Sequence, residues 1–495
     1  MAIDNKLIKD KWLYWPVLIL LIYFFYRLID QSQLIFHFPL DYNNDISAYI
    51  AQLHFLKECG FHNFCQYWYN SFIAFQITPP GWFYFALPFY YLFGNITLAT
   101  YTTLLLSFIL SFFIIYFVWK YLGFSNMQRI AIFSFLFINA ISIGNFVRLG
   151  RVHELFSWVF FLLFLFFILY YKDKEINNLF FLIIPVYALL IISYFSVAVL
   201  ASFLFIGFFL IKSNKERFIV FSCFLLSIIL VSFWLIPFFI GALTYSSITN
   251  YLQSYWLWQF FGPNLLTNII TLIVPIVLFV LFYFYLKSVD NYKKELLFFL
   301  PVNFLAILFF SRVVTFLPVL RDINPDPYLV FFLFFIFFFL FKLRNNLINK
   351  NLFKFVPLIL FLFALLSVSI NIIHTPEFVT SEEKIDLDLL LSSFNGSFLV
   401  LGGFPSSVYP PALYSYAPIY YNLSTPSGWY PHVKDQEYLD LLKSININNS
   451  CSLLLNKLSY FNTTHVIGYS NSCNKFDECS FDFVKSSSGF CLYAL

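Results

Sequence analysis

The sequence predicts a mainly α-helical, polytopic membrane protein with about eleven transmembrane helices and a C-terminal extracytoplasmic α/β domain. Hydrophobic residues make up 61% of the 495 residues and charged residues only 11%, whereas a soluble domain is about half apolar and a quarter charged. The apolar residues form runs that can cross a bilayer, which takes about 17–25 residues. After about residue 374 the composition returns to that of an ordinary globular domain.

Each apolar run is expected to be a helix, because a backbone in lipid must satisfy its own hydrogen bonds. The stretch 179–211 has no polar turn. We divide it into a hairpin, because a single helix would place the next basic loop on the opposite side of the membrane. The predicted spans are 12–29, 98–119, 130–146, 155–171, 179–195, 196–211, 218–240, 267–286, 295–311, 325–341 and 355–373.

The basic residues predict the orientation. One set of loops holds 17 of the 29 Lys and Arg residues, and such loops face the cytoplasm. The N-terminus is therefore expected inside and the C-terminal domain outside. Residues 1–30 resemble a signal peptide in part, but the apolar run is long and no small-residue cleavage site follows it. We therefore take this segment as the first span.

Glycosylation motifs and cysteines fit the same topology, since all but one of them lie in segments predicted to be outside. An even number of cysteines on an oxidising face predicts disulfides. Cys59 and Cys65 form a plausible local bridge, and the other four allow three pairings. Metal binding is the alternative for the Cys473/Cys479 spacing. The sequon asparagines are Asn95, Asn395, Asn422, Asn448 and Asn462, and the six outer cysteines are Cys59, Cys65, Cys451, Cys473, Cys479 and Cys491.

Two domains are predicted, a transmembrane domain over 1–373, whose first outer loop covers 30–97, and an α/β domain over 374–495. In the latter, Phe398–Leu401 and Thr464–Gly468 are strand candidates. A turn signal at 485–489 predicts a hairpin, and 435–445 has the apolar periodicity of a helix.

The first outer loop holds most of the candidate chemistry. Asp41 and Asp45 precede a stretch, 46–58, that predicts an amphipathic helix, and Gly60 is suited to end it. The simplest role for Asp45 is to cap that helix, which is worth about 1 kcal/mol. Trp68 follows, and then the run Thr78–Tyr84, which begins a short apolar helix over 81–93.

Four arginines lie in short outer loops of the membrane domain: Arg148, Arg151, Arg312 and Arg321. Arginine matches phosphate oxygens bidentately and keeps its charge, so this group predicts a bound lipid phosphate. His153 and Glu154 stand beside Arg151. The alternative for Arg148 and Arg312 is an arginine that extends from a helix end to the interface. Basic residues occur singly rather than in a stripe, so nucleic-acid binding is not predicted.

The segments Asp45–Gly60, Trp68, Thr78–Tyr84 and Gly150–Glu154 together resemble the GT-C superfamily of membrane glycosyltransferases. Among these the resemblance is strongest to the membrane proteins labelled "6-pyruvoyl-tetrahydropterin synthase-related". The pterin name carries no functional weight.

The resemblance implies transfer of a sugar from a polyprenyl-phosphate donor to a glycan, glycolipid or protein acceptor on the extracytoplasmic face, with inversion. It places the general base at Asp45, with Asp41 as the competing candidate. The leaving phosphate needs cations, which Arg151 or Arg321 would supply. Trp68 and Tyr84 are assigned to substrate binding with the arginines, His153 and Glu154.

Cofactor use stays open in the sequence. Glu154 is a candidate either to orient the acceptor or to bind a divalent cation with Asp45. The first loop lacks a D-x-D motif, and the chain lacks the W-W-D-x-G motif of oligosaccharyltransferases, which argues against transfer of whole glycans to asparagine. The alternatives are a transporter or flippase for lipid-linked sugars, and a membrane-anchored structural or adhesion protein. An archaeal cell membrane is the expected location, with the endoplasmic reticulum as the alternative.

Overall fold

A computed structural model describes residues 11–38, 45–244, 265–343, 355–374, 382–405, 410–429 and 433–495. The chain divides into two compact units. The first, here called the helical unit, comprises Met1–Ile29, Leu104–Leu235 and Thr249–Pro376. The second, here called the loop–tail unit, comprises Asp30–Thr103, Ile236–Ile248 and Glu377–Leu495. The separate domain predicted from residue 374 onward stays a prediction.

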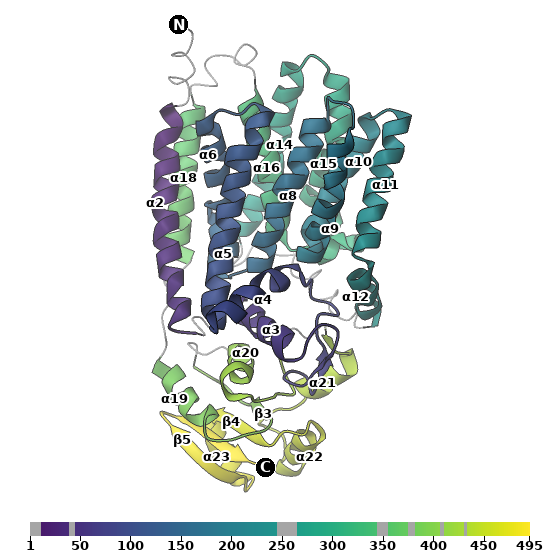
Figure 1. Ribbon diagram of the computed structural model, residues 1–495. Helices are drawn as coiled ribbons and strands as arrows, with labels where there is room; N and C mark the ends of the chain where they lie inside the picture. The colour runs from purple at the N-terminus through teal and green to yellow at the C-terminus, as the bar shows by residue number, and fades with distance from the viewer. Residues whose placement is uncertain are drawn as a thin grey trace. The chain divides into compact units, whose positions relative to one another are not determined.

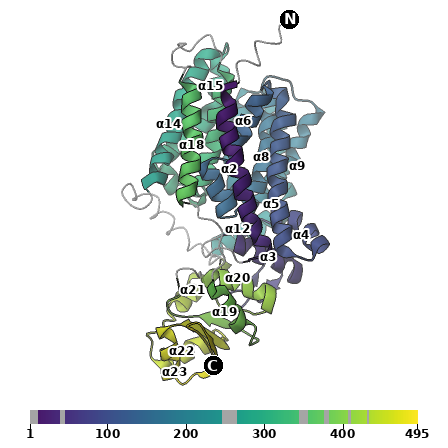
Figure 2. The same cartoon turned by 90° about the vertical axis from the view of Figure 1, so that its left-hand side faces the viewer.

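The helical unit consists of long apolar helices (Figure 1). The first, α2, and the last, α18, lie side by side in both views (Figures 1 and 2). The helices are α2 (Tyr14–Gln31), α5 (Ile96–Phe113), α6 (Asn126–Phe137), α7 (Ala140–Ser142), α8 (Val152–Tyr171), α9 (Ile183–Ser193), α10 (Phe195–Ile211), α11 (Asn214–Leu230), α12 (Ser232–Thr244), α14 (Leu265–Ser288), α15 (Tyr292–Phe310), α16 (Pro325–Lys342) and α18 (Val356–His374). The first turns of α5 and most of α12 belong by sequence to the loop–tail unit. The shorter turns are η1 (Lys11–Leu13), η3 (Ile114–Val118), η4 (Trp119–Leu122), η5 (Ile143–Arg148), η6 (Asn178–Leu182), η8 (Val313–Phe316) and η9 (Leu320–Asp322).

Helices occupy all eleven ranges predicted from the sequence, but fewer of them qualify as spans. In the part of the chain that the structure describes, six helices are long and apolar enough to cross a membrane, or eight if each of two bent pairs counts as one span. The bent pairs are α6 with α7–η5, at 49°, and α11 with α12, at 73°. The chain is thus a multi-pass membrane protein, and the count of eleven spans is not confirmed.

The predicted hairpin within 179–211 is present. Tyr194 adopts an extended conformation between α9 and α10, and the two helices run antiparallel, since Phe180 stacks on Phe208 while Tyr187 packs on Phe205. Only a glycine fits at position 207 of α10, because a Cβ there would lie 2.0 Å from the Phe298 carbonyl oxygen of α15.

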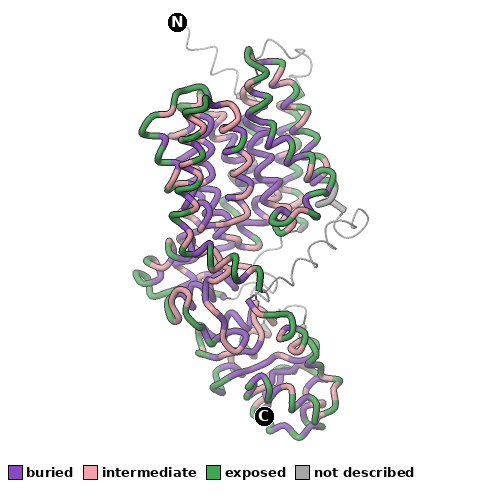
Figure 3. Tube along the Cα trace, turned by 90° about the vertical axis from the view of Figure 1, so that its right-hand side faces the viewer, coloured by how far each residue is buried: buried purple, intermediate pink, exposed green. Residues whose placement is uncertain are grey.

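The core of the helical unit is built mainly from phenylalanine. Helices α8 and α16 are its most buried spans, and the tube view shows burial concentrated in the interior helices (Figure 3). Every residue of α16 from Pro327 to Phe339 is buried. Stacked ring pairs, such as Phe135 on Phe337 and Trp158 on Phe334, fill the space between helices. This packing explains why one residue in seven is phenylalanine.

The loop–tail unit combines short helices with a four-stranded sheet in the order β3-β4-β6-β5. Strand β3 is parallel to β4, and the other pairs are antiparallel. Strands β5 and β6 form the predicted hairpin, with Ser488 and Gly489 at positive φ in its turn. The elements are η2 (Ser32–Ile35), α3 (Ile46–Glu58), β1 (Phe64–Cys65), β2 (Phe72–Ile73), α4 (Gly81–Phe93), α19 (Glu382–Leu391), β3 (Phe398–Val400), α20 (Pro410–Tyr421), α21 (Gln436–Lys443), α22 (Cys451–Tyr460), β4 (His465–Tyr469), α23 (Asn471–Glu478), β5 (Asp482–Ser487) and β6 (Phe490–Ala494).

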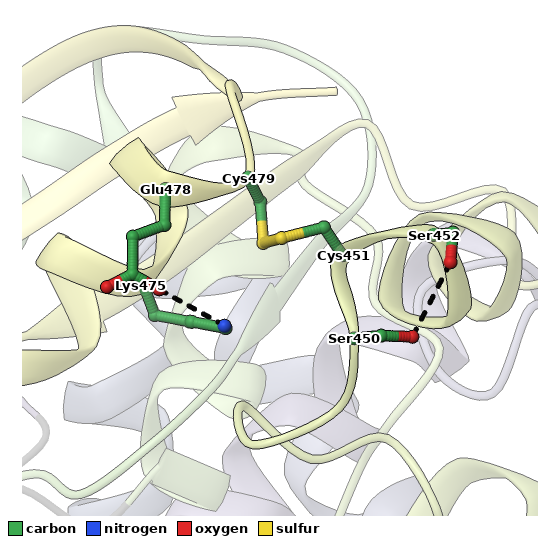
Figure 4. Close-up of a disulfide and its surroundings, with 6 residues drawn as sticks. All are labelled: Ser450, Cys451, Ser452, Lys475, Glu478 and Cys479. Atoms are coloured by element: carbon green, nitrogen blue, oxygen red, sulfur yellow. Dashed lines mark hydrogen bonds and ion pairs between the residues drawn. A yellow bond between two sulfur atoms is a disulfide. The ribbon is translucent and has the colours of Figure 1, made fainter.

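Three disulfides cross-link the loop–tail unit. Cys59 bonds to Cys65, as predicted. Of the three pairings open to the other cysteines, the structure has Cys451 with Cys479 and Cys473 with Cys491. Figure 4 shows the Cys451–Cys479 bridge between the start of α22 and the end of α23. With all four tail cysteines in disulfides, the metal-binding alternative for the Cys473/Cys479 spacing no longer applies.

Candidate active site

Asp45 stands at the first turn of α3 in the loop–tail unit. Its side chain makes no capping hydrogen bond, and its backbone is already helical, with φ −60° and ψ −22°. Helix capping therefore does not explain the aspartate. At the other end, Gly60 has φ +85° and its N–H donates to the Phe55 carbonyl at 3.2 Å, so the predicted glycine stop is confirmed. Asp41 lies outside the described residues.

Helix α3 has no solvent-exposed polar face between Ile46 and Leu56, so the prediction of an amphipathic helix was wrong. All residues from Ile46 to Leu56 are buried, including the polar Gln52 and His54. Helices α4 and α20 pack against it, and the Phe55 ring stacks on Tyr67. The sequence showed a polar stripe, but tertiary packing covers it. A helix enclosed on all sides holds the residue at its first turn in a fixed position.

Trp68 has a structural role instead of the predicted substrate contact. Its side chain is 1% exposed, and its indole N–H donates to the Tyr414 carbonyl at 2.7 Å. A parallel bridge joins it to Thr425, and a Cβ on Gly428 would lie 3.0 Å from the indole. No indole surface is left for a ligand. Trp68 joins the first loop to the tail segment of the same unit.

A second group of predicted residues meets in the helical unit. Arg151 donates to Asn145 Oδ1 at 3.0 Å and contacts the Asp326 carboxylate at 3.4 Å. The Asn145 amide in turn donates to Glu154 Oε1 at 2.9 Å, and the Trp158 indole N–H lies 3.4 Å from the same oxygen. The result is one hydrogen-bonded network that runs from Asp326 to Trp158.

Local chain geometry builds this network at the N-terminal ends of α8 and α16. The π-helical segment η5 ends at Arg148, Gly150 turns the chain with φ +67°, and α8 begins at Val152. Glu154 and Asp326 therefore both fall in the first turn of a helix, where the helix dipole favours a carboxylate. Arg151 lies between the two acids and offsets their charge.

Glu154 is the most enclosed member. It is 0% exposed, and its Oε2 atom has no hydrogen-bond partner among the described residues. A buried polar oxygen without a partner costs free energy. A ligand hydroxyl or amide that donates to Oε2 would recover that cost. Asn145, Trp158 and Asp326 were not selected from the sequence, although polar residues at the ends of apolar runs were a signal that could have found them.

Two of the predicted substrate-binding residues, His153 and Arg148, differ in their surroundings. His153 is buried, and its ring packs edge-on against Tyr194 at 4.7 Å, at the break between α9 and α10. Arg148 is exposed at the end of η5. His153 is therefore a packing residue next to the network, whereas Arg148 is accessible at the surface of the helical unit.

The remaining predicted residues make contacts with other parts of the chain. Arg312 is buried, and its guanidinium donates to the Thr271 hydroxyl at 2.5 Å. Arg321 lies 3.8 Å from the adjacent Asp322 carboxylate. Tyr84 in α4 is 44% exposed and is therefore accessible. Arg312 thus secures η8 to α14, while Arg321 stays half exposed.

Within the ranges that the structure describes, no group of three or more His, Cys, Asp or Glu side chains is placed to hold a metal ion. The five sequon asparagines are all exposed, and all lie in the loop–tail unit. Asn95 also accepts hydrogen bonds from the Thr97 hydroxyl and the Leu98 N–H at the start of α5.

Known proteins match this chain in structure rather than in sequence. No protein-family model matches the sequence, and no curated protein matches it. The structure resembles the arabinofuranosyltransferase AftD from Mycobacteria with a TM-score of 0.55 and 11% identity, over 96% of this chain and 39% of that one. It resembles the Archaeoglobus fulgidus oligosaccharyltransferase with a TM-score of 0.54 and 13% identity, over 92% of this chain and 70% of that one.

The chain shares the fold of these two membrane proteins. The archaeal oligosaccharyltransferase AglB, solved with an inhibitory peptide and a dolichol-phosphate, matches it with a TM-score of 0.51 and 10% identity, over 92% of this chain and 69% of that one. The fold that the GT-C resemblance implies is therefore supported, whereas the narrower pterin-named group is not confirmed. The chain spans about two fifths of the length of AftD.

Proposed function

We propose that this protein is a membrane glycosyltransferase that moves a sugar from a polyprenyl-phosphate donor to a hydroxyl or amide acceptor on the extracytoplasmic face. The observation that carries the proposal is Asp45, a carboxylate at the first turn of the buried helix α3 that does not cap the helix, within a GT-C fold. Partners of the proposed reaction are membrane lipid, the lipid-linked donor and a glycan, glycolipid or protein acceptor.

The reaction assigns one task to each kind of residue. Asp45 takes the proton of the acceptor hydroxyl as the acceptor oxygen attacks the anomeric carbon. The bond from that carbon to the phosphate oxygen breaks, and the phosphate leaves with the electron pair. Attack from the face opposite the phosphate inverts the anomeric centre. The leaving group needs no proton, but it needs positive charge nearby.

Arg151 is our candidate for that charge, with Arg321 as the second. Arg151 is already fixed by Asn145 and Asp326, so little side-chain entropy is lost when it binds a phosphate. Glu154, with its unpartnered Oε2, is proposed to orient a hydroxyl of the substrate. The proposed reaction does not require a divalent cation held by Asp45 or Glu154. If EDTA abolished transfer, a divalent cation would have to be added to the mechanism.

Topology and source belong to the same proposal. The N-terminus is assigned to the cytoplasm and the loop–tail unit to the outside, where its sequons and disulfides have their usual compartment. An archaeal cell membrane is the proposed location, with the endoplasmic reticulum as the alternative.

The test is Asp45→Asn in membranes supplied with radiolabelled polyprenyl-phosphate sugars. A general base contributes about 10²–10⁴ in rate, so transfer is expected to fall by about a thousandfold while the amount of inserted protein is unchanged. Glu58→Gln is the matched control, because Glu58 lies at the other end of α3 and, among the described residues, forms its ion pair with the neighbouring Lys57 at the surface. Full activity in the Asp45 variant would overturn the assignment of the base.

A further inference from the structure

A basic recess lies at the end of the helical unit opposite to the Glu154 network. It encloses about 260 Å³, and its lining includes Tyr121, Lys172, Asp173, Lys174, Tyr285 and Lys342. Glu154 and Lys172 are at opposite ends of α8 and 18 residues apart, which is about 27 Å along a helix. The recess is therefore a different place from the proposed active site.

Most charges around the recess are paired. The Lys172 ammonium is bonded to Glu295, whose other oxygen accepts from the Tyr285 hydroxyl at 3.0 Å. Asp173 is bonded to Lys294 at 2.8 Å. Although burial raises the pKa of Asp173, the hydrogen bond from Lys294 and the charge of Lys172 outweigh it and lower that pKa. These carboxylates are used by other lysines.

Two lysines of the recess have no carboxylate partner. Among the described residues, neither Lys174 nor Lys342 forms an ion pair within 4 Å. Lys174 lies over the Tyr170 ring at 3.4 Å. Lys342 donates to the Leu122 carbonyl oxygen and lies over the Phe124 ring at 4.7 Å. Among the residues that the structure describes, the recess thus has two lysine charges that no carboxylate offsets within 4 Å.

Helix dipoles alone do not account for this arrangement. Lysine is favoured near the C-terminus of a helix, by about 0.3–1 kcal/mol, and Lys342 ends α16 while Lys174 follows α8. That preference places one lysine at each helix end. The dipole preference does not explain why lysines from separate helices meet in one recess, where the described carboxylates nearby are paired with other lysines.

We propose that this recess binds a phosphate group carried by an anionic lipid of the adjacent leaflet. A pocket of basic side chains between transmembrane helices is suited to an anionic headgroup. Tyr121, 64% exposed at its rim, is the type of residue that lies at the lipid headgroup level. The proposal does not rest on the glycosyltransferase assignment, since it concerns other residues and is tested by binding alone.

The test is native mass spectrometry of the full chain, released from detergent micelles that contain dioleoyl phosphatidylglycerol or dioleoyl phosphatidylcholine. The wild-type protein is expected to retain phosphatidylglycerol preferentially. Each lysine near a headgroup is worth about fivefold in anionic-lipid binding, so Lys174→Gln with Lys342→Gln should lower retention by about tenfold or more. Retention equal to wild type in that double variant would overturn the proposal.

Lys215→Gln with Lys287→Gln is the matched control, because both lysines are exposed and neither lines the recess. It removes the same charge and should leave retention unchanged. An equal loss in both double variants would mean a general charge effect and would also overturn the site. Lys342 bonds to the Leu122 carbonyl, so its replacement could disturb the fold. Lys174→Gln alone therefore serves as a second variant, because the Lys174 side chain is exposed and lies over the Tyr170 ring.

The source of the phosphate is distinguished by a further arm. Inorganic phosphate is added at millimolar concentration to the lipid-free protein, and the thermal unfolding midpoint is measured. No shift, with selective retention of phosphatidylglycerol, supports the lipid. A phosphate-dependent rise that Lys174→Gln abolishes, without lipid selectivity, would instead assign the recess to a free phosphate compound and overturn the lipid source.

Discussion

The helical unit and the loop–tail unit are stabilised by different contacts. In the helical unit, long helices satisfy their own backbones, and phenylalanine rings pack between them. Its described cysteine, Cys223, is free. The loop–tail unit has short helices and strands, and it holds all three disulfides and all five sequon asparagines.

The difference follows from the expected solvent of each unit. Apolar side chains such as Ile22 and Ile29 are more than 60% exposed on the helical unit, which suits lipid and not water. In lipid an unpaired backbone group is costly, because no water can bond to it. The backbone hydrogen bonds of a helix therefore keep it folded there, and covalent cross-links are not needed. The loop–tail unit has short elements, and disulfides compensate for a small core. The two units are therefore expected to respond separately to two sets of substitutions and to a change of pH.

The largest effect is expected from Trp68→Ala in the loop–tail unit. A buried tryptophan replaced by alanine costs about 3–5 kcal/mol of unfolding free energy, and the Tyr414 carbonyl also loses its donor. Hydrogen exchange followed by mass spectrometry should show lost protection in 64–73 and 410–428, with 152–171 unchanged. Trp15→Ala is the control, because Trp15 is 66% exposed on α2. Equal loss of protection in 152–171 would mean that the two units do not respond separately.

A smaller effect is expected from Cys473→Ser with Cys491→Ser. This bridge closes a segment of 18 residues, and a disulfide of that size contributes about 3 kcal/mol. The sheet around β4 and β6 should become more exchangeable, while α8 and α16 keep their protection. Cys223→Ser in the helical unit is the control. Unchanged hydrogen exchange around β4 and β6 without this bridge would show that the core of the loop–tail unit is enough to keep it folded.

The smallest effect is expected from pH. Burial lowers the pKa of His54 below its ordinary value of 6.5, against the charge of Glu58, which raises it. Burial also lowers the pKa of His62 and His465. As the pH falls, these histidines are therefore protonated in the unfolded chain before they are protonated in the folded one. The free energy of unfolding is highest above pH 6.5 and decreases as the pH falls below that value. The thermal midpoint of the loop–tail unit should fall between pH 7 and pH 5, and less so in His54→Gln. An equal fall in that variant would exclude His54 as a source.

Local features of the fold could be predicted from the sequence. The helix over 81–93, the Gly60 stop and the hairpin around Gly489 all depend on residues within a few positions of each other. The break at Tyr194 was inferred from topology rather than from propensity, and the structure contains it. Short-range conformational preference and the length of a bilayer set these elements.

The candidate site was predicted only in part. Arg151 and Glu154 were selected because charge in an apolar chain is costly, and both lie in one network. Asn145 and Trp158 were missed, because an amide or an indole carries no charge that marks it in the sequence. Trp68 was assigned to substrate because an aromatic residue in a loop has the same letter whether it is covered or exposed.

Composition and periodicity are properties of single segments, so the amino-acid sequence could indicate a helical, apolar chain whose basic residues concentrate in one set of loops. The folded chain was needed to establish which cysteines pair in the tail, that α3 is enclosed, and that Asp326 lies beside Arg151. Each of these joins segments separated by many residues. Local conformational preferences do not predict these long-range contacts, because the contacts form only when the helices and strands pack together.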